Sequence, residues 1–86
     1  MRIISWNVNG IRASVKKGLV EQINNHQADI WCFQETKAQD DQVIEALSDL
    51  SSKYHIQSTS AVKKGYSGVA ILAKKSTFGE AAPSWS

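Results

Sequence analysis

Two polar side chains stand where apolar stretches of the sequence end, and their chemistry is that of a metal site. Glu35 follows residues 30–33, an unbroken apolar run, after one glutamine, and Asn7 follows the mostly apolar residues 3–6. Carboxylate and amide oxygens can bind Mg²⁺, which keeps several waters and leaves positions for a phosphate. Each residue also has a simpler interpretation: Glu35 as a surface carboxylate, and Asn7 as a side chain that bonds backbone groups at a strand end. Asn9, directly before a glycine, is foremost a turn former, with a role near the metal as its second interpretation.

Basic residues occur in two places that could face a polyanion. Arg12, Lys16 and Lys17 fall on one predicted helix, and residues 63–66 read Lys-Lys-Gly-Tyr. Such groups would suit a nucleic-acid backbone, because cations neutralise phosphates and an aromatic ring stacks on bases. The alternatives are a solvated helix face and a polar hairpin tip. The net charge of +2 and the pI near 8.8 permit a polyanionic partner without requiring one.

The elements that must position these residues follow from the pattern of apolar side chains. Residues 2–8 and 30–33 are predicted strands, joined by helical material over residues 11–25 whose apolar stripe is interrupted at Gly18. The interruption predicts either a kinked helix or a short turn followed by a helix. A strand–helix–strand unit of this length has parallel strands, so their carboxyl ends meet at one edge of the sheet. We therefore expect the three polar residues named above to converge.

The second half of the chain predicts one more helix and an antiparallel hairpin. Gln39 begins the helix, acidic residues occupy its first turn, and it ends at Ser51. Its inner face is assigned to Val43, Ile44, Leu47 and Leu50. Residues 54–60 form a weaker strand and residues 67–74 a strongly apolar one, and their short connection makes the pair antiparallel. If the first of these strands runs parallel to its predecessors, the connection lies at the edge that carries Glu35.

These elements predict an α/β fold of order β-α-β-α-β-β, with one mixed sheet and both helices on a single face. The strands are apolar on both faces, so the uncovered face requires either self-association or further layers of a larger domain. Residues 1–76 are assigned to this domain and residues 77–86 to a loose tail. Cys32, the only cysteine, excludes an internal disulfide and favours a reducing compartment. Because no apolar run is long enough for a membrane span, we expect an intracellular, cytoplasmic chain without a membrane partner.

Three of these segments also resemble a known family. Residues 5–13 (Ser-Trp-Asn-Val-Asn-Gly-Ile-Arg-Ala), 34–37 (Gln-Glu-Thr-Lys) and 64–70 (Lys-Gly-Tyr-Ser-Gly-Val-Ala) are similar, in order and spacing, to the exonuclease III family of apurinic/apyrimidinic (AP) endonucleases. That family is part of the endonuclease/exonuclease/phosphatase superfamily. The resemblance implies a four-layer αββα sandwich, of which this chain would be the N-terminal portion. It also implies cleavage of the phosphodiester 5′ to an abasic site in double-stranded DNA, often with 3′-to-5′ exonuclease activity. The implied cofactor is Mg²⁺, with Mn²⁺ as the alternative ion.

The resemblance assigns roles to individual positions. Glu35 corresponds to the metal-ligating glutamate, Asn7 to the active-site asparagine beside it, and Asn9 to a position near the metal. The positions that approach the DNA backbone are Arg12, Lys37, Gly65 and Tyr66. The family's later Asp-x-Asn motif and C-terminal Asp-His pair have no counterpart in these 86 residues, so we expect incomplete catalysis from this chain alone. The alternatives are a non-catalytic nucleic-acid-binding module and a phosphatase of the same superfamily that acts on a small phosphorylated substrate.

Overall fold

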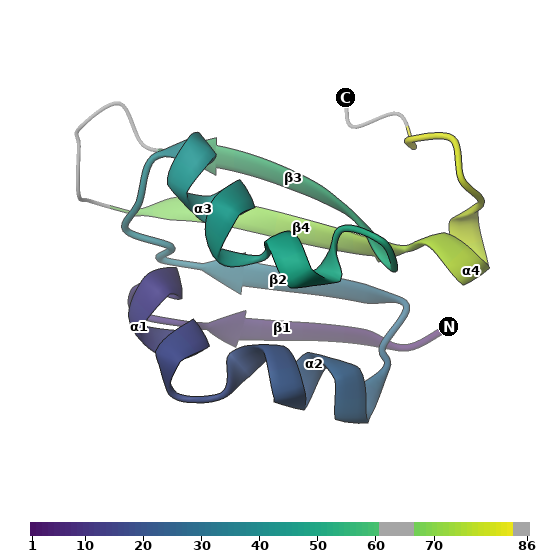
Figure 1. Ribbon diagram of the computed structural model, residues 1–86, viewed down its shortest axis with the longest axis horizontal. Helices are drawn as coiled ribbons and strands as arrows, with labels where there is room; N and C mark the ends of the chain where they lie inside the picture. The colour runs from purple at the N-terminus through teal and green to yellow at the C-terminus, as the bar shows by residue number, and fades with distance from the viewer. Residues whose placement is uncertain (61–66, 84–86) are drawn as a thin grey trace.

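One four-stranded sheet organises the chain, and its strands are ordered β1-β2-β4-β3 (Figure 1). The computed structural model describes residues 1–60 and 67–83. In chain order the elements are β1 (Ile3–Asn7), α1 (Ile11–Lys16), α2 (Leu19–His26), β2 (Ile30–Gln34), α3 (Asp40–Ala46), the 3₁₀ helix η1 (Ser48–Leu50), β3 (Tyr54–Ser60), β4 (Gly68–Lys74) and α4 (Lys75–Phe78). The predicted α/β class and the single mixed sheet are confirmed.

The strand directions decide which side chains share an edge. β1 and β2 are parallel, and β4 is antiparallel to both of its neighbours, β2 and β3. β3 therefore runs in the same direction as β1 and β2. The carboxyl ends of these three strands and the start of β4 lie together at one edge, which we call the Glu35 edge. The opposite edge, where β4 ends, is called the far edge.

Gly18 divides the first helical segment into two helices. Its φ of +103° is a left-handed conformation that only glycine adopts without strain, so α1 ends before it and α2 begins after it. The interruption at Gly18 is as predicted, but residues 11–16 form a helix of their own, so the segment is neither one kinked helix nor a turn followed by a helix. α3 begins after Gln39, whose backbone N–H donates to the Gln42 side chain at 2.9 Å. Asp40 and Asp41 lie in its first turn, where carboxylates favour the helix dipole.

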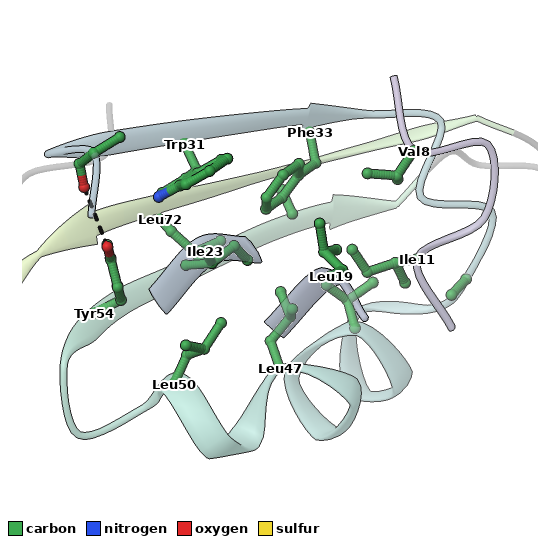
Figure 2. Packing of buried hydrophobic residues seen from close by; sticks show 14 residues of the cluster. Val8, Ile11, Leu19, Ile23, Trp31, Phe33, Leu47, Leu50, Tyr54 and Leu72 are labelled. Carbon is green, nitrogen blue, oxygen red and sulfur yellow. Dashed lines mark hydrogen bonds between the residues drawn. The ribbon is translucent and has the colours of Figure 1, made fainter. Parts of the chain in front are cut away.

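All three longer helices cover the same face of the sheet, and the core lies between them (Figures 1 and 2). Trp31 and Phe33 point from β2 into this layer, with ring centroids 5.7 Å apart. The helices contribute fully or nearly fully buried side chains at Ile11, Leu19, Ile23, Val43, Leu47 and Leu50. The assignment of Ile44 to the inner face was wrong, because its side chain is 42% exposed. One helical step of about 100° turns it away from the buried stripe.

Most of the other face of the sheet has no covering element within residues 1–60 and 67–83. At the far edge, His55 and Ala73 lie on this face and are buried, and His55 is bonded to Gly79, the residue after α4. Ile3, Cys32, Val69 and Ile71 share this face by strand register, and Ile3 is 62% exposed. Gln34 lies among them, and its side-chain amide donates to Ser5 Oγ at 2.8 Å and to the Cys32 backbone oxygen at 3.1 Å. We call this surface the open face. Helices on a single face are as predicted, and self-association through the open face stays a prediction.

The first residues of the predicted tail are attached to the domain. Thr77 Oγ1 donates to the Asp29 carboxylate, and His55 Nε2 donates to the Gly79 oxygen at 2.7 Å. Residues 84–86 of that tail lie outside the described residues. Within the described ranges, no helix has the length and apolar character needed to cross a membrane.

Candidate active site

Asn7 and Glu35 meet at the Glu35 edge, as their positions in the sequence predict. Asn7 is the last residue of β1 and is paired with Gln34, so Glu35 stands one residue beyond this register pair. Asn7 Nδ2 donates a hydrogen bond to Glu35 Oε2. Asn7 Oδ1 accepts the backbone N–H of Asn9 at 3.0 Å. Of the two polar atoms of the Asn7 side-chain amide, only the oxygen can accept the Asn9 N–H. This second bond therefore fixes the Asn7 side chain with its nitrogen toward Glu35.

Lys37 completes this group of polar side chains. Its Nζ donates to Asn9 Oδ1 at 2.5 Å and lies 3.9 Å from Glu35 Oε1. The structure joins Lys37 to Asn9, so one network connects Asn7, Asn9, Glu35 and Lys37. The predicted approach of Lys37 to DNA stays a prediction. The Glu35 side chain is 43% exposed, which leaves its carboxylate accessible to a ligand from solvent.

The backbone that carries these side chains is held in an uncommon conformation. Asn9, Glu35 and Lys37 have φ angles of +48°, +55° and +52°, in the left-handed region that residues with a Cβ rarely adopt. Each such residue costs on the order of 1 kcal/mol or more and persists only where the surrounding structure imposes it. Three of the four positive-φ non-glycine residues in the described chain lie in this one group. Sequence reasoning did not find this feature, although Asn9-Gly10 is a turn signal that points to it.

Main-chain hydrogen bonds between the two loops impose this conformation. The N–H groups of Gly10 and Ile11 donate to the backbone oxygens of Glu35 and Thr36 at 2.8 and 2.9 Å. The Thr36 N–H in turn donates to the Gly68 oxygen at 3.1 Å, which ties the Glu35 loop to the start of β4. Three segments far apart in the sequence are thus bonded through their backbones directly behind the polar side chains.

Gly68 is a residue of this site that sequence reasoning did not single out. A Cβ at this position would lie 2.5 Å from Oγ1 of Thr36, a distance that real Cβ atoms essentially never show. Thr36 is fully buried, and its hydroxyl has no hydrogen-bond partner in the described structure. A glycine at the first position of a strand can signal such a close approach.

A basic cavity lies beside the polar group. It has a volume of about 330 Å³, and Arg12, Lys16 and Lys37 line it together with Gly10, Ala13 and Thr36. The predicted DNA-contacting residues Arg12 and Lys37 are therefore brought together. Gly65 and Tyr66, the other two, lie outside the described residues. The pair that flanks them, Ser60 and Gly68, is at the Glu35 edge.

The donor set can hold a divalent cation through one carboxylate. Glu35 offers the accessible oxygens, and Asn7 Oδ1, which accepts the Asn9 N–H, keeps a second lone pair. In the described ranges, no three His, Cys, Asp or Glu side chains gather as a metal cluster. This fits Mg²⁺, which commonly takes one or two protein carboxylates and completes its shell with water and substrate phosphate. Asn7 orients the Glu35 carboxylate through Nδ2, and its role as a direct metal ligand stays a prediction.

Comparisons with known proteins agree on one family. The chain matches the Endonuclease/Exonuclease/phosphatase family over residues 4–85. It is 48% identical over 77 residues to an exodeoxyribonuclease of Bacillus subtilis, covering 87% of this chain and 29% of that protein. It is 45% identical over 82 residues to DNA-(apurinic or apyrimidinic site) endonuclease 2 of Xenopus laevis, covering 95% of this chain and 16% of that protein.

Solved structures give the same result. The catalytic domain of Xenopus laevis APE2 superposes with a TM-score of 0.69 at 45% identity, covering 88% of this chain and 24% of that one. An AP endonuclease from Archaeoglobus fulgidus superposes with a TM-score of 0.71 at 28% identity, covering 85% of this chain and 27% of that one. The chain therefore spans less than a third of the length of each of these relatives.

Proposed function

The chain belongs to the endonuclease/exonuclease/phosphatase family, and within it to the exonuclease III-type AP endonucleases. On this premise we propose that its Glu35 edge serves Mg²⁺-dependent hydrolysis of DNA phosphodiesters at abasic sites. The observation that carries the proposal is the hydrogen-bonded group of Asn7, Asn9, Glu35 and Lys37 beside a basic cavity. A lone accessible carboxylate next to cationic side chains suits a phosphate that arrives with a divalent ion.

Each residue of the group has a distinct task in this proposal. Glu35 would hold Mg²⁺, which when bound supplies the positive charge that stabilises the phosphate during attack by water. Asn7 orients the Glu35 carboxylate by donating to Oε2, and the Asn9 N–H keeps the Asn7 amide in the donating orientation. Lys37 neutralises part of the negative charge at Oε1 and ties Asn9 to the same group.

The basic cavity is proposed to bind the DNA backbone. Arg12 and Lys16 place cationic groups along it, and a guanidinium can engage a phosphate through two parallel hydrogen bonds. Gly65 and Tyr66 are proposed to extend this contact from the β3–β4 connection. Because each neutralised phosphate releases counterions, binding at this surface should weaken steeply with salt.

The chemistry also needs groups that the described residues do not provide. Glu35 is the single carboxylate of the polar group, and no histidine or aspartate accompanies it there to activate a water. Catalytic groups act as a unit, so loss of some members commonly removes several orders of magnitude in rate. We therefore expect the 86 residues alone not to cleave abasic DNA measurably.

The test is nicking of a DNA duplex that carries one abasic analogue, with Mg²⁺ and with EDTA. A version extended to the length of the relatives should nick the duplex, and Glu35→Gln in that version should lower the rate by about a thousandfold or more, because the ion is lost. Glu21→Gln, at an exposed carboxylate on α2, is the matched control and should leave the rate of nicking unchanged. Full activity of Glu35→Gln would contradict the assigned site. EDTA-sensitive nicking by the short chain, purified free of host nuclease, would contradict its inactivity.

A second candidate function is DNA binding without catalysis. It is favoured by the cationic surface of Arg12, Lys16 and Lys37, which is present in this chain although only one carboxylate stands beside it. The two functions differ in their dependence on metal. Fluorescence anisotropy of a labelled abasic duplex separates them: binding by the short chain that is unchanged by EDTA supports the second candidate.

A further inference from the structure

A second cationic pocket lies at the far edge of the sheet, away from the site described above. Its volume is about 350 Å³, and the side chains that matter here are Lys53, Lys74 and Lys75, with Asn24, Gln27 and Ser76 beside them. It adjoins the last residue of β4, whereas the Glu35 edge adjoins the first. At about 3.4 Å per residue, the length of β4 separates the two by roughly 20 Å.

Backbone hydrogen bonds bring the three lysines together from separate segments. The Lys75 N–H donates to the Lys53 oxygen at 2.9 Å, which joins the start of α4 to the turn before β3. The Lys74 N–H donates to the Asp29 oxygen at 2.8 Å, which joins the end of β4 to the turn before β2. The positions of the three side chains are thus fixed by the fold, and only their flexible ends can move.

The ammonium groups of this pocket are not matched by carboxylates in contact with them. Lys74 Nζ lies 3.4 Å from both the backbone and the side-chain oxygen of Gln27, and Lys53 Nζ lies 3.4 Å from Asn24 Oδ1. These are long contacts to neutral oxygens. In the part of the chain that the structure describes, the one lysine–carboxylate contact within 4.0 Å is Lys37–Glu35, at the other edge.

The nearby acids only partly balance this charge. Glu80 lines the pocket, and Asp29 lies close enough to Lys74 for an electrostatic interaction between their charges. The Asp29 carboxylate, however, already accepts the Arg2 backbone N–H at 2.7 Å and the Thr77 hydroxyl. Three ammonium groups therefore stand against two carboxylates, one of which is already engaged, and the pocket keeps a net positive charge.

We propose that this far-edge pocket binds a phosphate group. Ammonium groups act as strong point-charge donors to phosphate oxygens, and the side chains of Asn24 and Ser76 add neutral donors at the rim. The volume lies in the range of small-ligand sites and accommodates pyrophosphate or a mononucleotide. The phosphate can come from a small phosphorylated molecule or from a nucleic-acid strand. This inference is independent of the proposed cleavage activity, because it uses another edge of the sheet.

The test is a titration of the ¹⁵N-labelled chain with sodium pyrophosphate, followed by amide chemical shifts at constant ionic strength, with EDTA and without Mg²⁺. Saturable shifts are expected at the amides of Lys53, Lys75 and Ser76. The double variant Lys53→Ala/Lys75→Ala should bind about tenfold more weakly, because each exposed ion pair contributes up to about fivefold. The double variant with arginine at both positions should retain binding. Lys17→Ala, directly after α1 and outside the lining of this pocket, is the control and should bind pyrophosphate like the parent chain.

A second titration with a short DNA duplex identifies the source of the phosphate. Shifts at the same lysine amides with DNA support a nucleic-acid strand, whereas shifts there with pyrophosphate alone support a small phosphorylated molecule. Equal affinity of the parent chain and the double alanine variant would overturn the proposal, as would shifts spread evenly over all lysines. Unchanged resonances elsewhere in the variant show that it is folded. No step of this test depends on cleavage, so its failure and that of the nuclease proposal are distinguishable.

Discussion

Replacing Gly68 by alanine tests how the start of β4 supports the Glu35 loop. The new Cβ would lie 2.5 Å from Thr36 Oγ1, about 0.9 Å inside ordinary van der Waals contact, which begins near 3.4 Å. Thr36 is fully buried and cannot move aside without displacing the loop, so Gly68→Ala should destabilise the fold by about 1–3 kcal/mol, the usual range for overpacking. Urea denaturation followed by circular dichroism measures this change in the free energy of unfolding.

A double-mutant cycle isolates the cause. The next atoms that the new Cβ meets, Cα of Ser60 and the Thr59 oxygen, are both at 3.5 Å, which is ordinary contact. Removing the hydroxyl with Thr36→Ala should therefore abolish the penalty, and alanine at position 68 should then be neutral or slightly stabilising. Thr36→Ala alone loses a methyl group but also removes a buried hydroxyl without a partner, so we expect its own effect to be small. Additive effects of the two substitutions, or a neutral Gly68→Ala alone, would refute this explanation.

Three further predictions concern the core, the far edge and the open face. Tyr54→Phe removes a buried hydrogen bond to the Ala28 oxygen and should lower the free energy of unfolding by about 1–2 kcal/mol, as measured in urea. The pKa of Asp29 is lowered below 3.8, chiefly by the Arg2 backbone N–H, so its stabilising effect is present above that pH and is lost as the pH falls through the lowered value. Asp29→Asn should flatten the acid limb of a stability–pH profile, and an unchanged limb would count against this. Val69→Lys on the open face should reduce hydrophobic-dye binding and self-association in sedimentation; a parent chain that is monomeric and binds no dye would contradict the premise.

The pattern of apolar residues, together with the parallel strands of a strand–helix–strand unit, was enough to predict the Glu35 edge. A strand–helix–strand unit leaves little freedom in where its carboxyl ends lie, so Asn7 and Glu35 had to meet. The strand order was harder, because the hairpin could add to β2 through either of its strands. β4 is an inner strand of the sheet because it is apolar on both faces. The more polar β3 suits the position of an outer strand, where fewer side chains are buried.

Local sequence could not predict the details that depend on distant contacts. The left-handed conformations of Glu35 and Lys37 carry no signature of their own, since neither residue type favours positive φ, and the backbone bonds from Gly10 and Ile11 impose them. The helix stripe likewise could not decide Ile44, because a residue at the border of an apolar face is buried only if a neighbouring element reaches it. Contacts between distant parts of the chain determine both the backbone conformation of Glu35 and Lys37 and the exposure of Ile44.

The backbone bonds behind the site also determine when it can form during folding. Asn7 and Glu35 are 28 residues apart in sequence, and Thr36 is bonded to a strand that begins at Gly68. Contacts of such long range require closure of long loops and make folding slow relative to local structure. During synthesis the first βαβ unit leaves the ribosome before β4 exists, and until β4 docks the Thr36 N–H has no strand partner. The bond from Thr36 to Gly68 is therefore a property of the completed sheet, whereas the bonds that Gly10 and Ile11 donate lie within the first βαβ unit and do not need β4.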